Sequence, residues 1–359
     1  MRGGRPRQVH RLPCGLKIAN VVEFGSGKPV TVRGVPMVVY IGRRTPRIAM
    51  FVGIFTAAIL VHSVVLAASD DIPTELAFIE GVIGDEQEAV DSVRRFDRAQ
   101  QALAAWDLDT ARTHGANGEV EDADRHTALA QHRITLIDQA YRLILKHYTE
   151  NARALTYYGE LLYDRLGDPA TAINNWRKAT ALDRSLSAPH NNLGLHYCHT
   201  GDYRMGLREL DRALELDEDH ADYHFNIAQI YLVNGPQVEN IRGWDKKRIY
   251  REAMKHSKNA AVLAPDDYDL QQDYAVNFFA AENYGVTADW KDAAEAWSVA
   301  RAKARSEVEE FYTWLNEARV WIERGDERRA KPCLEEALVL VPDSVIVSGL
   351  LEKIQKKGD

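Results

Sequence analysis

The sequence predicts an all-α protein built from stacked helical hairpins. When the copies are aligned, two positions hold small residues, and from copy to copy both positions shift by the same 34, 47, 40 and 37 residues. A third position between them shifts by the same intervals. Within each copy, apolar residues recur every three or four positions. This agreement indicates a unit of 34 residues with insertions of 13, 6 and 3. Such units bury their apolar faces by stacking. The columns are Ala172, Gly206, Ala253, Ala293 and Ala330, then Trp176, Leu210, Ser257, Trp297 and Leu334, then Ala179, Ala213, Ala260, Ala300 and Ala337.

The clearest copy of the unit spans residues 187–218. Its apolar residues predict two helices of about 13 residues, each with one buried stripe. Gly201-Asp202 interrupts the pattern and predicts the turn between them. Gly194 and Gly206 lie on the two predicted helices and are small enough to let the backbones pack closely.

This copy resembles a tetratricopeptide repeat, whose pattern is a large residue, Leu-Gly, Tyr, a small residue, Phe and Pro. Leu193-Gly194 and Tyr197 match the pattern, and Pro265 and Pro342 occupy the terminal proline position in two other copies. The resemblance covers residues 126–357 in about five copies. It implies a right-handed superhelix in which the first helix of each hairpin lines a concave binding groove.

Further helices are expected on both sides of the repeats, which we place at 126–342. Residues 126–148 predict the second helix of a partial repeat, and residues 343–359 predict a capping helix that begins at Asp343-Ser344. The segment 70–125 is expected to begin with an amphipathic helix. This helix packs on the first repeat or pairs with another chain. Residues 107–122 have little apolar periodicity and predict a linker.

The uncharged apolar segment at residues 48–69 predicts export. Arginines precede it and two aspartates follow it, which is the layout of a secretory signal peptide. Its length is also close to the roughly 20 residues that span a bilayer, so a retained anchor is the second interpretation and a buried helix the third. In the first two, the arginines stay inside and the repeats lie on the periplasmic or extracellular side.

Residues 1–47 predict an unstructured basic leader. They hold many arginines, glycines and prolines and show little periodicity. Met37 and Met50 are alternative start sites, in which case the upstream stretch is an over-extended reading frame.

The charge of the remaining chain argues against nucleic acid as a partner. Residues 1–69 contain 10 of the 45 basic residues and one of the 53 acidic ones, which leaves 35 − 52 = −17. Phosphate backbones favour clustered Lys and Arg, and an acidic surface disfavours anionic lipid as well.

No motif in the sequence points to catalysis, and we expect no cofactor or metal. Cys198 and Cys333 lie in distant repeats and are expected to be free, apolar and unreactive. His190 and His224 share one packing position of the repeat, so the histidines of the second and third copies need no metal to explain them. Nucleophile elbows, phosphate loops and HExxH motifs do not occur.

Two surfaces are predicted to bind a peptide or protein: the groove of the first helices and the insertion after Gly235. The groove departs from a carboxylate clamp, because Thr156, Glu160 and Asp222 stand where the cations of such a clamp would be. We therefore expect it to accept a basic or mixed polar and apolar segment. The insertion gathers cations around a tryptophan, which either contacts the partner or packs on its own hairpin. The predicted binding residues are Glu160, Tyr163, Asn191, Leu195, His199, Phe225, Asn226, Gln229, Arg242 and Trp244.

The sequence therefore predicts an exported, non-enzymatic scaffold that binds a peptide or protein in a preformed groove. Two alternatives remain open: a subunit that assembles an envelope complex, and a metal-dependent envelope enzyme. The sequence does not identify the partner.

Overall fold

The structure is a computed structural model that describes residues 31–32, 35–36 and 74–358. The predicted signal peptide or anchor at 48–69, and nearly all of the leader, lie outside the described residues. The described helices divide into two compact units, one that ends at Leu193 and one that begins at Gly194. Each unit is described by itself. Strands β1 (Thr31–Val32) and β2 (Val35–Pro36) form a two-stranded antiparallel pair.

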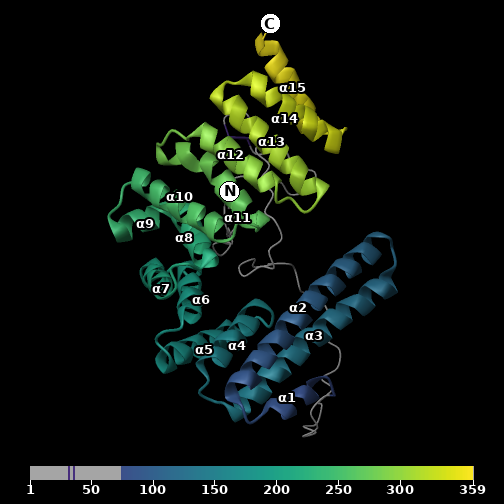
Figure 1. The fold of residues 1–359 in the computed structure, drawn as a ribbon, viewed down its shortest axis with the longest axis vertical. Helices are drawn as coiled ribbons and strands as arrows, with labels where there is room; N and C mark the ends of the chain where they lie inside the picture. Colours follow the sequence, from purple (N-terminus) through teal and green to yellow (C-terminus); the bar gives the residue numbers. More distant parts are fainter. Residues whose placement is uncertain (1–30, 33–34, 37–73, 359) are drawn as a thin grey trace, which may run out of the picture. The chain divides into compact units, whose positions relative to one another are not determined.

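The predicted all-α solenoid of helical hairpins is confirmed (Figure 1). Helices up to the unit boundary are η1 (Thr74–Leu76), α1 (Ala77–Val82), α2 (Glu86–Ala116), α3 (Val120–His147), α4 (Ala152–Asp164), α5 (Pro169–Leu182) and α6 (Ser187–His199), which crosses it. The others are α7 (Tyr203–Leu216), α8 (Ala221–Val233), α9 (Gly235–Arg242), α10 (Lys246–Leu263), α11 (Tyr268–Asn277), η2 (Phe278–Tyr284), α12 (Trp290–Arg301), α13 (Glu307–Arg324), α14 (Glu327–Leu340) and α15 (Val345–Gly358).

The Gly-Asp pairs found in the sequence form the turns of three hairpins. Gly201 has φ +92°, in the left-handed region that favours glycine. Asp202 then caps α7, because its carboxylate accepts a hydrogen bond of 3.1 Å from the backbone N–H of Met205. Gly167-Asp168 before α5 and Gly325-Asp326 before α14 repeat this arrangement.

The repeating columns lie in the interior, as their spacing predicts. All members are buried, and the alanines of the two small-residue columns are fully buried. Between α6 and α7 the approach is closest. A Cβ added at Gly206 would lie 2.8 Å from both the Cys198 backbone nitrogen and the Gly194 carbonyl oxygen. The small residues therefore set the distance between paired helices.

The prediction of a linker at residues 107–122 is wrong. Residues 107–116 continue α2, which packs along α3 as a long hairpin closed by a turn at 117–119. The helices contact each other there through polar groups: fully buried Asp107 accepts hydrogen bonds from Arg133 (2.7 Å) and His126 (2.9 Å). Because apolar periodicity detects only apolar contacts, this segment resembled a linker.

The insertion after Gly235 forms the short helix α9 and extends α10 at its N-terminal end. Gly243 ends α9 in the left-handed conformation, and Asp245 caps α10. In the fourth hairpin, η2 follows α11 directly, and Gly285 ends it in the left-handed conformation. The described helices include none that is long and apolar enough to span a membrane.

We expect Gly206→Ala to lower the free energy of unfolding by about 1–3 kcal/mol, the usual cost of overpacking. The added methyl group would meet backbone atoms that cannot move without separating α6 from α7. Urea unfolding followed by circular dichroism measures the effect. Gly349→Ala in α15 is the control: its Cβ meets nothing within 4 Å, so the variant should keep or gain up to about 1 kcal/mol. Equal effects at both sites would contradict the packing argument.

Candidate functional site

In the unit that ends at Leu193, the predicted groove residues contact neighbouring helices. Glu160 on α4 forms an ion pair of 2.8 Å with Arg94 on α2 and accepts a hydrogen bond of 3.4 Å from Asn192. Tyr163 is half-buried against the ring of Trp176. Asn191 is 6% exposed and donates to Asn192. Glu160 thus links α4 to α2 and α6, and contacts with neighbouring side chains engage all three residues.

Two of the predicted binding residues, Leu195 and His199, lie on the part of α6 that follows the unit boundary. Their environments differ. Leu195, expected on the groove surface, is 7% exposed and packs in a hydrophobic cluster with Ile227 and Ile230 of α8. The next hairpin covers it, so it belongs to the core. His199 is half-buried, and burial together with His196 lowers its pKa below the ordinary value.

The third set of predicted residues lies on α8 and joins a polar network. Phe225 is half-buried and Asn226 is 8% exposed. Gln229 donates a hydrogen bond of 2.6 Å to the Asp273 carboxylate on α11. That carboxylate also accepts hydrogen bonds from Ser257 on α10 (2.8 Å) and from the Asn277 amide (3.0 Å). One carboxylate thus connects three helices from two successive hairpins.

Within residues 74–358, the side chains that donate hydrogen bonds to the Asp273 carboxylate, Gln229, Ser257 and Asn277, are all neutral. Burial therefore raises the pKa of Asp273 to about 7, and the hydrogen bonds from Ser257 and Asn277 only partly oppose it. The neutral acid is favoured in the folded protein, and it ionises near neutral pH.

Two histidines, one on α8 and one on α10, form a hydrogen-bonded pair. His224 Nδ1 and His256 Nδ1 are 2.8 Å apart, and His224 Nε2 donates to the Glu218 carbonyl oxygen at 2.9 Å. Neutral His224 therefore has its lone pair on Nδ1 and accepts a hydrogen bond from the Nδ1–H of His256. Burial and the neighbouring imidazole lower the pKa of His256 to about 4, and burial lowers that of His224.

The predicted residues of the insertion, Arg242 and Trp244, lie together. Arg242 pairs with Asp211 at 2.6 Å. Trp244 is half-buried and packs edge-on against Tyr231, with ring centroids 5.7 Å apart. The guanidinium of Arg248 lies over the indole, 4.5 Å from its centroid. The tryptophan thus packs on its own hairpin, and the cations around it stay half-buried or exposed.

A hollow of about 380 Å³ beside α10 was not predicted from the sequence. Tyrosines and a phenylalanine line it together with three cations and two carboxylates. The cations recur at positions 251, 255 and 258, a spacing that places them on one face of α10 and was the only signal in the sequence. The lining residues are Tyr250, Arg251, Met254, Lys255, Lys258, Tyr274, Phe278, Thr287, Ala288, Asp289 and Asp292.

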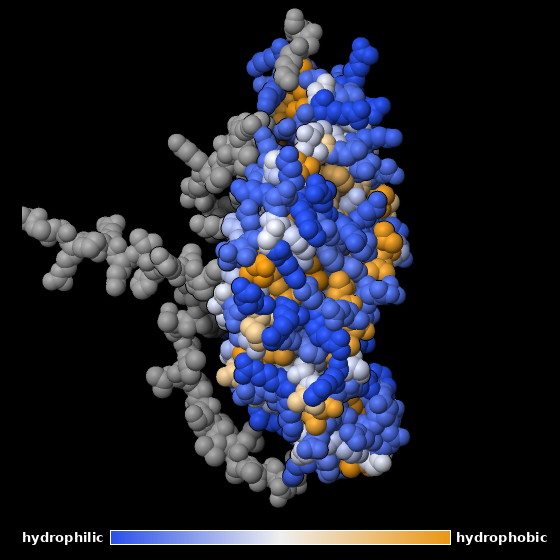
Figure 2. All heavy atoms as spheres, turned by 90° about the vertical axis from the view of Figure 1, so that its left-hand side faces the viewer, coloured by the Kyte–Doolittle hydropathy of each residue, from blue (hydrophilic) through white to orange (hydrophobic). Residues whose placement is uncertain are grey.

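The surface around these features is mostly hydrophilic. On the face drawn in Figure 2, apolar side chains form small separate patches between polar ones. Partner recognition on such a face depends on placed charges and a few aromatic contacts more than on a continuous apolar strip.

The resemblance to tetratricopeptide repeat proteins is confirmed at the level of the fold, because the chain forms successive hairpins with small residues at their contacts. No family profile matches the sequence, and no curated protein matches it significantly.

Several solved structures resemble parts of the chain. YrrB, a TPR protein with an unusual peptide-binding site, is 14% identical over 60% of this chain and 99% of its own, with a TM-score of 0.45. The C-terminal part of a TPR repeat-containing protein from Cytophaga hutchinsonii is 13% identical over 76% and 98%, with a TM-score of 0.46. PilF of Pseudomonas aeruginosa is 13% identical over 71% and 99%, with a TM-score of 0.42. Likenesses this low carry no argument about function.

The two titratable groups predict opposite pH dependences of stability. The pKa of Asp273 is raised, so its contribution to stability is complete below its ordinary value of 3.8 and is lost as the pH rises through about 7. The pKa of His256 is lowered, so its contribution is complete above 6.5 and is lost as the pH falls through about 4.

We expect Asp273→Asn to remove the loss of stability on going from about pH 5 to pH 8, and His256→Gln to remove the loss on acidification. Urea midpoints measured between about pH 4 and pH 8 for the wild type and both variants test this. Unchanged slopes in both variants would show that other groups control the pH dependence.

Proposed function

We propose that the chain is an exported, non-enzymatic scaffold that binds a protein through an acidic segment containing an aromatic residue. The fold supports a binding role, because stacked hairpins present extended surfaces of fixed side chains. Such preformed surfaces lose little conformational entropy when a partner binds.

The observation that carries the proposal is the charge of α10. This helix has six Lys and Arg residues and one acidic residue, in a chain whose net charge is −8. Arg251, Lys255 and Lys258 are exposed and line the hollow, and Tyr274 and Phe278 lie in the same lining. Cations beside aromatic side chains favour a partner that brings a carboxylate and an aromatic ring together.

Two carboxylates in the same lining orient such a partner. Asp289 caps α12 and Asp292 lies in its first turn, and both would repel an acidic side chain. A carboxylate of the partner therefore favours the cations of α10, and its aromatic ring packs on Tyr274 and Phe278. Specificity of this kind combines attraction with local repulsion.

A binding role also accounts for the groups with shifted pKa values. The Asp273 carboxylate contacts neutral side chains that join α8, α10 and α11, and His256 is bonded to His224. Both interactions connect helices. We therefore assign these groups to the alignment of successive hairpins, without a catalytic step.

Charge reversal on α10 tests the proposed surface. We expect Lys255→Glu/Lys258→Glu to weaken binding of fluorescein-labelled peptides of alternating Glu and Tyr by about tenfold or more, measured by fluorescence anisotropy. Binding by the wild type should weaken as salt rises, since exposed charges are screened.

Lys331→Glu/Lys353→Glu on α14 and α15 is the matched control, because both lysines are exposed on other helices. This variant should keep the affinity of the wild type. The proposal of an acidic partner would be refuted if the wild type, the α10 variant and the control bound the Glu and Tyr peptide equally. It would also be refuted if the wild type bound a peptide of alternating Lys and Tyr as well as the acidic one. Neither result would affect the description of the fold.

Export rests on the sequence of residues 43–71. Fractionation of the source cells should place the protein in the envelope or outside the cell. N-terminal sequencing should find a start near residue 70 if the segment is a cleaved signal, or upstream of residue 48 if it is a retained anchor. A product in the cell interior that begins within residues 1–36 would contradict export.

A further inference from the structure

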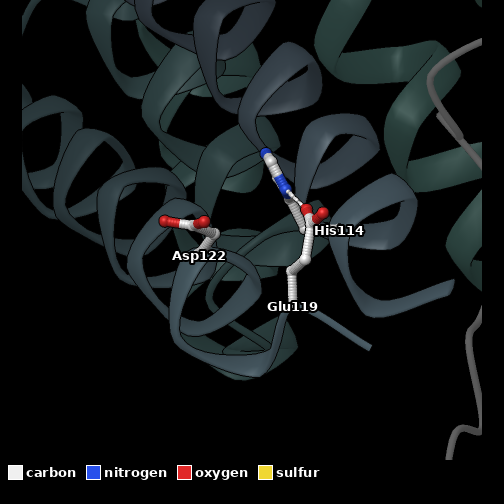
Figure 3. A group of neighbouring side chains, drawn as sticks. All are labelled: His114, Glu119 and Asp122. Atoms are coloured by element: carbon white, nitrogen blue, oxygen red, sulfur yellow. Dashed lines mark hydrogen bonds and ion pairs between the residues drawn. The ribbon is translucent and has the colours of Figure 1, made fainter. Parts of the chain in front are cut away.

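The closed end of the α2–α3 hairpin gathers one imidazole and two carboxylates. His114 lies in the last turn of α2, Glu119 precedes α3, and Asp122 lies in the first turn of α3. One donor atom from each lies within 4.8 Å of the others. Figure 3 shows the His114 ring meeting the Glu119 carboxylate, with Asp122 beside them.

The backbone of the turn brings these side chains together. Gly118 has φ +81°, and its N–H donates to the Gly115 carbonyl oxygen at 3.2 Å. The N–H of Glu119 reaches back to the carbonyl oxygen of His114 at 2.9 Å. His114 and Glu119 are thus joined by a backbone hydrogen bond, and Asp122 follows on the helix that the turn begins.

A second imidazole beside this group is oriented by a buried carboxylate. His126 stacks on His114, with ring centroids 5.6 Å apart and an angle of 8°. Its Nδ1 contacts Asp107, which also accepts from Arg133. Burial raises the pKa of Asp107, but the hydrogen bonds from Arg133 and His126, together with the electrostatic attraction of these two side chains, lower that pKa below its ordinary value.

Ionised Asp107 only accepts hydrogen bonds, so the His126 Nδ1 carries the hydrogen. Neutral His126 then keeps its lone pair on Nε2. Histidines that bind metals are oriented in this way, by a carboxylate on the other ring nitrogen. The contact between Asp107 and His126 thus places an oriented imidazole beside His114.

We propose that His114, Glu119 and Asp122 bind one divalent transition cation of the Zn²⁺ class at the end of this hairpin. Nitrogen and carboxylate oxygen donors suit such an ion, and the two carboxylates match its charge. Water completes the coordination, with His126 adjacent. This site is independent of the proposed binding surface on α10.

Binding requires only small side-chain movements. Donors around a tetrahedral Zn²⁺ with bonds of about 2.0–2.1 Å lie closer together than 4.8 Å, so the side chains close inward. They are exposed or half-exposed and have room to do so. Asp122 also pairs with Arg125 at 2.6 Å, but that pair is exposed and costs little to break.

Calorimetric titration of the full chain with Zn²⁺, prepared without a histidine tag, tests the site. We expect one ion to bind per chain, and His114→Ala and Asp122→Asn each to weaken binding by about tenfold or more. Affinity should fall as the pH is lowered, since the ligands must be deprotonated to bind the metal. Zn²⁺ should also raise the thermal midpoint of the wild type.

Asp124→Asn and His132→Ala, both exposed on α3, are the controls and should keep the affinity of the wild type. Circular dichroism without Zn²⁺ checks that each variant is folded; Asp122→Asn preserves the shape of the side chain and remains informative if His114→Ala unfolds the hairpin. The site is refuted if wild type and His114→Ala/Glu119→Gln/Asp122→Asn bind Zn²⁺ equally, or if neither binds it.

Discussion

The close approach of paired helices is the constraint on which the rest of the structure depends. A helix with glycine or alanine at its contact allows its partner to approach until backbone atoms nearly touch, as at Gly194 and Gly206. Every hairpin in the repeats keeps a small residue in both flanking columns. The larger Trp176 of α5 then packs within the same hairpin, against Tyr163 and close to Gly159 of α4. This regular spacing positions every exposed side chain on the first and second helices.

Much of this arrangement follows from the sequence. Matching intervals in three columns predicted the hairpins, and the Gly-Asp pairs marked turns because glycine accepts a positive φ and aspartate caps the next helix. The α2–α3 hairpin was harder to predict. Its contacts depend on Asp107, whose partners His126 and Arg133 are 19 and 26 residues away, and no local periodicity records such a pairing.

The candidate sites also combine features that the sequence predicts with features that depend on contacts between helices. Residues on the first helices were found by register, but their exposure depends on the next hairpin: α8 covers Leu195, and Asp273 bonds Gln229. The hollow beside α10 combines side chains of α10, α11, η2, α12 and a loop, so no single segment reveals it. Sequence periodicity thus places side chains on helices, whereas contact between separate helices decides which remain free to bind.

The polar interior of the α2–α3 hairpin has a consequence for how the chain opens. Between Ala104 and Ala130 the buried apolar side chains are alanines, and they bury little apolar area. Local opening of that end therefore costs less free energy than opening of a hairpin filled by tryptophan or leucine. Its amide hydrogens should exchange with solvent before those of α13 and α14, and unfolding of this hairpin should begin at its turn. The end of α2–α3 is thus a segment whose order a bound ion or partner is able to control.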